Sequence, residues 1–517
     1  MKKMKFVLAC LLSFALILSL APTAFASNQI ESSSCSVHST SEEICSMFEL
    51  NDLTEVELKE ICDRVNGVDG LEHNDAFCLT TANALIEYYY SKYSKQRTNM
   101  PDYLLSAYNT ITEEQEITSS TYTSRSSSYI ISNSGRFRVY YDNAGSYENL
   151  IALAQFTGIL FDQMYTKYCV TYEFPAPISN TDDGYYNINI IPEETLNASG
   201  VTYHVLGQPQ KTYISISQDQ LVNYYENIDS SVRGVIAHEL MHAILRASGI
   251  YSSSSIEAAS LHEAMARAVG IETIPTYANR SNICSDIQSF ILQLHYSIGS
   301  IETAVFINGS AVFYLSIFEE YQDWEVMETM CNNFDSDQTI LSNLSSTLDY
   351  YYNDSIGNRY EKFLIYAVAP DHYFESSPSN NQSTLPGTIY SWGSPHAMHT
   401  INVSSTNETI RTSAPMSLPY LACNYIKITA NNSATKKITV TVYYNIADDS
   451  TAEPFGACVI HNSSTNSYTT SSGIVYDNEL YTTFTMSISG NDVAYIAIAN
   501  GGLYGDLQYT YEINISN

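Results

Sequence analysis

The chain has 517 residues, with 55 acidic against 23 basic side chains and a formal net charge of −32. A surface this acidic repels the phosphates of nucleic acids and of anionic membranes, so the composition argues against both as partners. The length is sufficient for two to four domains.

Residues 1–26 are predicted to be a secretory signal peptide. The start MKKMK is basic, an apolar run follows, and Ala24-Phe25-Ala26 supplies the small residues that favour cleavage after Ala26. No later segment approaches the ~20 apolar residues of a membrane-spanning helix. We therefore expect a secreted, extracellular protein without a membrane span.

Residues 27–134 form a predicted helical region that ends in a linker. Apolar residues recur at helical spacing in 53–65 and 76–93, whereas residues 113–134 are polar and rich in serine. The position behind a signal peptide fits a propeptide that is removed. It fits equally an N-terminal helical subdomain that stays attached.

Residues 135–370 are predicted to form an α+β domain with a mixed sheet and a mostly helical second half. Strands are predicted at RFRVYYD (136–142), VTYEF (170–174), YYNINIIP (185–192) and TYISIS (212–217). Helices are predicted at 148–168, around 234–245, at 256–270 and, in several pieces, over 283–369.

Residues 371–400 are rich in proline, serine and asparagine and are predicted to be a linker. Residues 401–517 then contain only strand patterns, separated by Asn, Ser and Gly, which favour an all-β sandwich. The predicted strands are YIKITA, KKITVTVYYN, ACVIHN, YTTFTMSIS, VAYIAIAN and LQYTYEINIS. We interpret this sandwich as an accessory domain of a multidomain chain.

The stretch GVIAHELMHAIL at 234–245 holds His238, Glu239 and His242 in the order His-Glu-x-x-His. Residues four apart share one face of a helix, so the two imidazoles can bind one metal ion, and the glutamate can reach a water on that ion. The alternative is a chance pattern, which arises in roughly one or two such chains per hundred. The apolar neighbours favour the metal, because buried polar groups need partners.

Catalytic zinc takes three protein ligands and one water, so a third ligand is expected on the next helix. Glu263 is our choice, 21 residues after His242, because Ala264 and Ala266 allow that helix to pack closely. Two rivals remain open. Glu257 lies near the start of its helix, where an acidic residue is ordinary.

His262 is the other rival for the third ligand. It is turned by about 100° from Glu263 around the helix, so we expect it to be a wall or surface residue instead. The ligand set that the spacing favours is therefore two histidines and one glutamate.

The His-Glu-x-x-His motif followed by Glu263 resembles the gluzincin zinc metallopeptidases. INGSAVFYLSIFEEY (307–321) and RYEKFLIYAVAP (359–370) look like the helical half of secreted bacterial members. The resemblance covers roughly residues 136–370. It implies a zincin-like domain in which TYISIS is the edge strand that pairs with substrate.

By this resemblance, His238, His242 and Glu263 bind one catalytic zinc ion and Glu239 is the general base. The implied function is hydrolysis of a peptide or protein substrate. The Gly-x-Met-Glu-Asn signature of the aminopeptidase branch is absent from the chain, which favours an endopeptidase. Acidity alone is consistent with calcium binding, but no motif supports it.

One position departs from the family. Aligned on Gly309, the tyrosine that stabilises the oxyanion in the aminopeptidase branch is replaced by Phe306. Tyr296, Tyr314 and His295 are alternative donors. The alternative function is therefore a catalytically weak or inactive peptidase-fold protein that serves binding or adhesion at the cell exterior.

Overall fold

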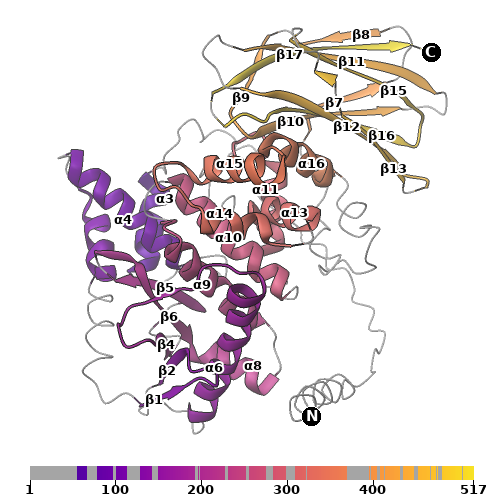
Figure 1. Cartoon of the computed structure of the whole chain (residues 1–517). Coiled ribbons are helices and arrows are strands. Elements are labelled where there is room, and N and C mark those ends of the chain that lie inside the picture. Colours follow the sequence, from indigo (N-terminus) through magenta and orange to yellow (C-terminus); the bar gives the residue numbers. More distant parts are fainter. Residues whose placement is uncertain are drawn as a thin grey trace, which may run out of the picture. The chain divides into compact units, whose positions relative to one another are not determined.

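Figure 1 shows the chain as a computed structural model. The structure describes residues 55–66, 79–96, 100–112, 128–141, 150–192, 196, 198–205, 207–227, 231–251, 256–274, 283–298, 309–321, 323–368, 395, 397–403, 408–412, 414–430, 435–446, 452–465, 467–472, 474–475, 480–503 and 505–516. The predicted signal peptide and most of the predicted linker at 371–400 lie outside these residues.

A mixed sheet forms the first half of the α/β region (Figure 1). Its strands are β1 (Ser128–Ile131), β2 (Phe137–Tyr141), β3 (Ile178–Ser179), β4 (Tyr186–Ile191), β5 (Gly200–Val205) and β6 (Gln208–Ser217). β2, β4 and β6 run parallel, while β5 pairs antiparallel with β6. The sequence NINII in β4 is buried on both faces except at its end, as expected for an inner parallel strand.

Three predictions about this sheet were wrong. Residues 128–131 were assigned to the linker but form β1, which pairs with β2. TYISIS is a strand but not an edge, because β6 pairs with β3, β4 and β5. VTYEF is not a strand: residues 166–171 form a π-helical turn, and Glu173 reverses the chain with a φ of 60°.

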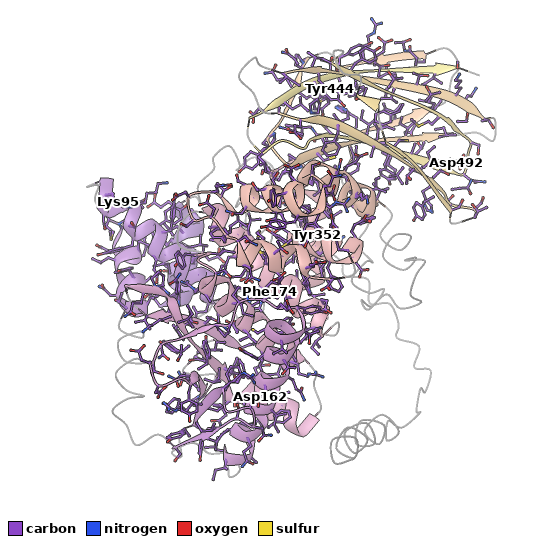
Figure 2. The ribbon with its side chains drawn as sticks, in the orientation of Figure 1. Lys95, Asp162, Phe174, Tyr352, Tyr444 and Asp492 are labelled. Atoms are coloured by element: carbon purple, nitrogen blue, oxygen red, sulfur yellow. The ribbon has the colours of Figure 1, made fainter. Side chains whose placement is uncertain are left out.

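The helix before this turn explains the third error. α6 (Leu150–Tyr165) continues directly into the turn, and the amide of Phe174 donates to the carbonyl of Tyr168. Both aromatic side chains are buried in the main core, where Figure 2 labels Phe174. Tertiary burial of the aromatics therefore overrides the β propensity of the segment.

The second half of the α/β region is mostly helical, and α9 and α10 pack against each other. Its helices are α8 (Gln218–Asn227), α9 (Ser231–Ala247), α10 (Ile256–Thr273), α11 (Ile283–Leu292), α13 (Ala311–Tyr321), α14 (Glu325–Asn332), α15 (Ile340–Tyr352) and α16 (Ile356–Val368). All but α8, which was not predicted, match the predicted helices, and α9 packs against both α10 and β6. Among the helices in the described part of the chain, none has the length and apolar character needed to cross a bilayer.

The N-terminal helical region packs against β5. It contains α3 (Glu55–Val65), α4 (Leu79–Gln96) and a helix at 102–112. Leu79 and Ala82 of α4 share a buried cluster with Val201 and Tyr203 of β5. α4 also contacts α10, so this region touches elements on both sides of α9.

Two sheets of the C-terminal region form a sandwich, as predicted. One has the order β13-β12-β16-β10-β7 and the other β14-β15-β11-β17-β8, with β9 paired to β17. The bounds are β7 (Ala397–Val403), β8 (Glu408–Arg411), β9 (Met416–Leu418), β10 (Ala422–Ala430), β11 (Lys436–Asn445), β12 (Pro454–Asn462), β13 (Ser467–Ser472), β14 (Ile474–Val475), β15 (Tyr481–Ile488), β16 (Asp492–Asn500) and β17 (Leu507–Ser516). β7 begins inside the segment predicted as a linker, which is therefore shorter than expected.

The central strands of the first sheet, β10, β12 and β16, are buried on both faces. Ile426 and Ile428 of β10 pack between the two sheets, whereas Tyr425 packs into the core of the helices. The hydroxyl of Tyr425 donates to the carbonyl of Leu364 in α16 at 2.8 Å. The sandwich is therefore joined to the helical half by a shared core as well as by the chain.

Candidate metal centre

α9 carries His238, Glu239 and His242 through the interior of the molecule. The helix is apolar on nearly every side and therefore buried. It ends at Gly249, whose φ is 89°, with amide-to-carbonyl bonds from Ile250 to Leu245 and from Gly249 to Arg246. This termination is a Schellman motif, which requires the positive φ that glycine adopts freely.

Three side chains converge where α9 meets α10. The Nε2 atoms of His238 and His242 are 3.0 Å apart, and Oε2 of Glu263 lies 3.6 Å from the first and 3.2 Å from the second. Among the residues that the structure describes, these three form the one group of metal-binding side chains that could hold an ion. All are buried, with at most 3% of each residue exposed.

The protonation of this group suits a cation. Burial lowers the pKa of His238 to about 3, so its ring is neutral and offers a lone pair. Burial alone would raise the pKa of Glu263, but His238, His242 and the charge of Arg267 outweigh it and hold that pKa well below the usual range. A carboxylate and a neutral imidazole are the forms that bind metals.

The spacing of these atoms fits zinc. Zinc binds imidazole nitrogen and carboxylate oxygen at about 2.0–2.2 Å, and a regular tetrahedron with such bonds has edges of about 3.3–3.6 Å. The three observed separations, 3.0, 3.2 and 3.6 Å, lie close to these edges. Two histidines with one glutamate are also a known ligand set of catalytic zinc.

Glu239 lies beside the group rather than within it. Its Oε1 is 4.0 Å from Nε2 of His238, and the hydroxyl of Thr202 on β5 lies 2.8 Å from both its Oε2 and its backbone carbonyl. A Cβ on Gly200 would come within 2.9 Å of Cγ of Glu239. The absent side chain of Gly200 therefore lets β5 approach the carboxylate closely.

Of the other candidate residues from the sequence, some lie outside the described residues and others are placed by the structure. The side chain of Glu257 and the whole of Phe306 lie outside the described residues. His262 is not a surface residue: it is fully buried, and its Nδ1 lies 2.8 Å from Nδ1 of His242. Tyr314 is buried in the main core, and Tyr296 is half-buried against it, so the oxyanion donor stays a prediction.

Sequence reasoning missed Gly200, Thr202 and Arg267. Nη2 of Arg267 donates to Oε1 of Glu263 at 3.1 Å. The spacing of four residues on one helix was a usable signal for this pair. The contacts from β5 to Glu239 join residues 37 positions apart, and no strand pattern in the sequence marked β5.

Comparison with known proteins does not assign a family. No family model matches the chain, and no curated protein matches it. Among solved structures, the pre-peptidase C-terminal domain of collagenase from Bacillus anthracis is similar at 16% identity and a TM-score of 0.16, over 24% of this chain and 100% of that one.

Two further structures are similar at the same level. PliG, a periplasmic lysozyme inhibitor from Aeromonas hydrophila, has 8% identity and a TM-score of 0.15, over 23% of this chain and 96% of that one. A GH115 4-O-methyl-α-glucuronidase, BtGH115A, has 7% identity and a TM-score of 0.15, over 57% of this chain and 44% of that one. Similarities this weak leave the function to the chemistry of the site.

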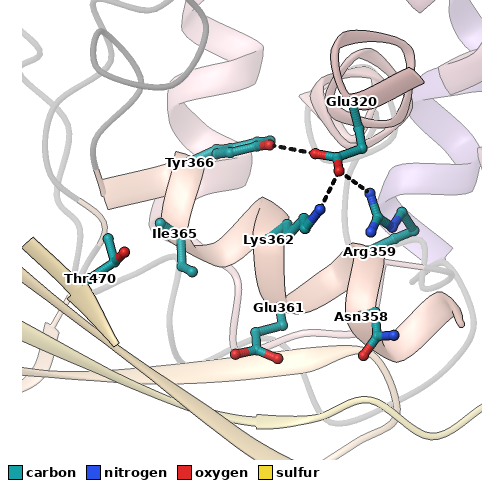
Figure 3. A pocket seen from close by; sticks show the side chains of 8 residues that line it. All are labelled: Glu320, Asn358, Arg359, Glu361, Lys362, Ile365, Tyr366 and Thr470. Carbon is teal, nitrogen blue, oxygen red and sulfur yellow. Dashed lines mark hydrogen bonds and ion pairs between the residues drawn. The ribbon is translucent and has the colours of Figure 1, made fainter. Parts of the chain in front are cut away.

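A cavity of about 360 Å³ lies elsewhere, between α16 and strand β13 (Figure 3). Charged side chains in its lining are paired with one another: Glu320 of α13 pairs with Arg359 and Lys362 of α16 and accepts from the hydroxyl of Tyr366. Burial raises the pKa of Glu320, but Lys362 and Arg359 lower it overall. This network holds α16 to α13, and we assign it no catalytic role.

Proposed function

We propose that the chain is a secreted zinc peptidase of the gluzincin type and that it cleaves within peptide chains. The observation that carries the proposal is the convergence of two Nε2 atoms and one carboxylate oxygen, all buried, with Glu239 beside them. A chance His-Glu-x-x-His pattern would not also bring a carboxylate from a separate helix to both imidazoles.

The chain divides the chemistry among its residues. A zinc ion held by His238, His242 and Glu263 would act as a Lewis acid and lower the pKa of bound water toward neutrality. Glu239 would accept a proton as that water attacks the scissile carbonyl and would return it to the leaving amine. Thr202 orients the Glu239 carboxylate for both transfers.

β5 supports a peptide as the substrate class. Among the described strands it pairs with β6 alone, and an extended peptide can add to such a strand through main-chain hydrogen bonds. Because Thr202 of β5 contacts Glu239, a peptide bound along β5 would pass the general base.

The buried position of the site supports the propeptide alternative for the part of residues 27–134 that precedes β1. α4 packs on β5 and contacts α10, while Glu239 is 2% exposed. Oε1 of Glu87 on α4 also lies 3.6 Å from Nε2 of His204 on β5. A substrate would therefore need α4 to be displaced, as removal of a propeptide would do.

Replacement of the general base tests the proposal. Glu239→Gln keeps the shape and removes proton acceptance, so zinc content should stay at about one per chain while hydrolysis of an unfolded protein falls about 10²–10⁴-fold. Glu272→Gln is the matched control, a buried glutamate of α10 that pairs with Lys167 instead. It should leave zinc content and hydrolysis near the wild-type values.

Two outcomes would contradict this assignment. Cleavage by Glu239→Gln at the wild-type rate would show that Glu239 is not the base. A zinc-loaded wild type without residues 27–127 that cleaves nothing in a broad peptide library would favour the binding or adhesion protein.

A further inference from the structure

Two side chains of α10 lie behind the metal-binding group without facing its centre. His262 contacts His242, and Arg267 contacts Glu263. Both are buried, with at most 2% exposed. Each therefore touches one presumed ligand on the side away from the other two.

The contact of His262 bears on the tautomer of His242. Nε2 of His242 faces Glu263 and His238, so this atom must carry a lone pair if it binds a metal. In a neutral imidazole the hydrogen then lies on Nδ1. That atom is 2.8 Å from Nδ1 of His262, so His242 must donate and His262 must accept.

The reverse arrangement would close the site. If Nδ1 of His262 carried the hydrogen and donated it, the hydrogen of a neutral His242 would sit on Nε2 and block metal binding. The two rings lie 4.7 Å apart between centroids with planes at 11°, so the bond also fixes the plane of His242. Metal-binding histidines commonly have a carboxylate or carbonyl in this place, which can only accept.

Arg267 acts on the third ligand. Its Nη2 donates to Oε1 of Glu263 at 3.1 Å, and Oε2 remains turned toward the two histidines. The guanidinium therefore determines which carboxylate oxygen is presented. Loss of Arg267 would remove this constraint on the rotation of the carboxylate about its last bond.

We propose that His262 and Arg267 are positioning residues of the metal site. His262 sets the tautomer and plane of His242, and Arg267 selects the oxygen of Glu263 that faces the ion. This proposal rests on the proposed zinc binding but not on peptide hydrolysis, because neither side chain faces the attacking water.

Zinc affinity of the full chain tests the role of His262. His262→Leu removes the acceptor, and His262→Asn places an amide oxygen near the position of Nδ1. We expect zinc affinity to fall about 10–100-fold in the Leu variant and distinctly less in the Asn variant. His399→Ala, an exposed histidine of β7, is the control and should bind zinc as the wild type does.

The visible spectrum of the cobalt-loaded protein gives a second readout, because it reports the ligand geometry directly. We expect the absorption bands to shift in His262→Leu and in Arg267→Met, and to return toward wild type in His262→Asn and Arg267→Lys. Circular dichroism identifies variants that fail to fold. If His262→Leu or Arg267→Met does not fold, His262→Asn or Arg267→Lys tests the positioning role in its place.

The results of these experiments distinguish the positioning role from the proposed peptidase activity. Wild-type affinity and spectrum in the Leu and Met variants would overturn the positioning role. If either of these variants does not fold, equal affinities and spectra for its Asn or Lys counterpart and the wild type would do the same. Absence of bound zinc from the wild type would refute both the metal site and the positioning role. Zinc binding without hydrolysis would refute only the proposed peptidase. Excess zinc should restore hydrolysis in His262→Leu but not in Glu239→Gln.

Discussion

Replacing Thr202 with valine should reveal whether its hydroxyl holds the carboxylate of Glu239. The change keeps the shape of a fully buried side chain and removes one hydroxyl, which lies 2.8 Å from both Oε2 and the carbonyl oxygen of Glu239. A hydrogen bond to a charged group contributes about 1.5–3 kcal/mol, against about 0.5–1.5 kcal/mol for a neutral pair. We expect Thr202→Val to lower the free energy of unfolding by about 2 kcal/mol.

A matched control lies on the neighbouring strand. The hydroxyl of Thr212 on β6 is equally buried and bonds the neutral hydroxyl of Tyr186 at 2.8 Å, so Thr212→Val should cost about 1 kcal/mol. Urea unfolding followed by fluorescence measures both, since Trp324 is buried in the helical half.

A double-mutant cycle decides where the single hydrogen of Thr202 goes. If it bonds Oε2, the cost of Thr202→Val should fall into the neutral range when Glu239 is already Gln. If it bonds the carbonyl oxygen, the cost is the same in both backgrounds. That second result, or equal costs for Thr202→Val and Thr212→Val, would refute the orienting role that we give Thr202.

Three further predictions concern the third ligand, acid stability and the N-terminal region. Glu263→Gln should weaken zinc retention far more than Glu257→Gln when both are dialysed against a chelator, and the opposite order would identify Glu257 as the ligand. His204 has its pKa lowered from 6.5 to about 3 by burial and by the charge of Arg246. Its neutral form stabilises the fold fully above pH 6.5, and this contribution is lost toward pH 3 by at most about 1.4 kcal/mol per pH unit. The free energy of unfolding of His204→Gln should therefore fall less than that of the wild type between pH 6.5 and pH 3. Parallel curves of unfolding free energy against pH would contradict this. Limited proteolysis should cut within 113–127 and 371–394. After the first cut, the N-terminal fragment should stay bound to the rest of the chain through Leu79 and Ala82. If the two fragments elute separately in gel filtration without denaturant, those contacts are weak.

Elements whose residue pattern arises from burial along their own length were predictable from sequence. The helix around 234–245 and the strand at 185–192 are α9 and β4, and each owes its pattern to burial along its own length. β5 was missed because its six residues include a histidine and a glycine, and the glycine lies at a position that faces α9. A strand that fits closely against a helix does not show the apolar alternation of a half-buried strand.

The residues of the candidate site also differ in how far the sequence alone could predict them. Residues that lie on one helix at a spacing of four were found, because the helix alone determines that they share a face. Glu263 required a guess about which carboxylate of the next helix turns inward, and the structure places its Oε2 3.2 Å from His242. His262 was misplaced because its helical angle was measured from Glu263 alone, whereas its neighbour is a ring on α9.

The difference between His262 and Glu263 shows how packing assigns roles that spacing leaves open. The two residues are adjacent and both meet His242, yet one contacts Nδ1 and the other Nε2. The ring of His242 is therefore held from both sides by a single turn of α10. Any shift of α10 relative to α9 would disturb the ligand and its orienting partner together. The small residues Ala264 and Ala266 are both fully buried, as expected if they allow α10 to pack closely.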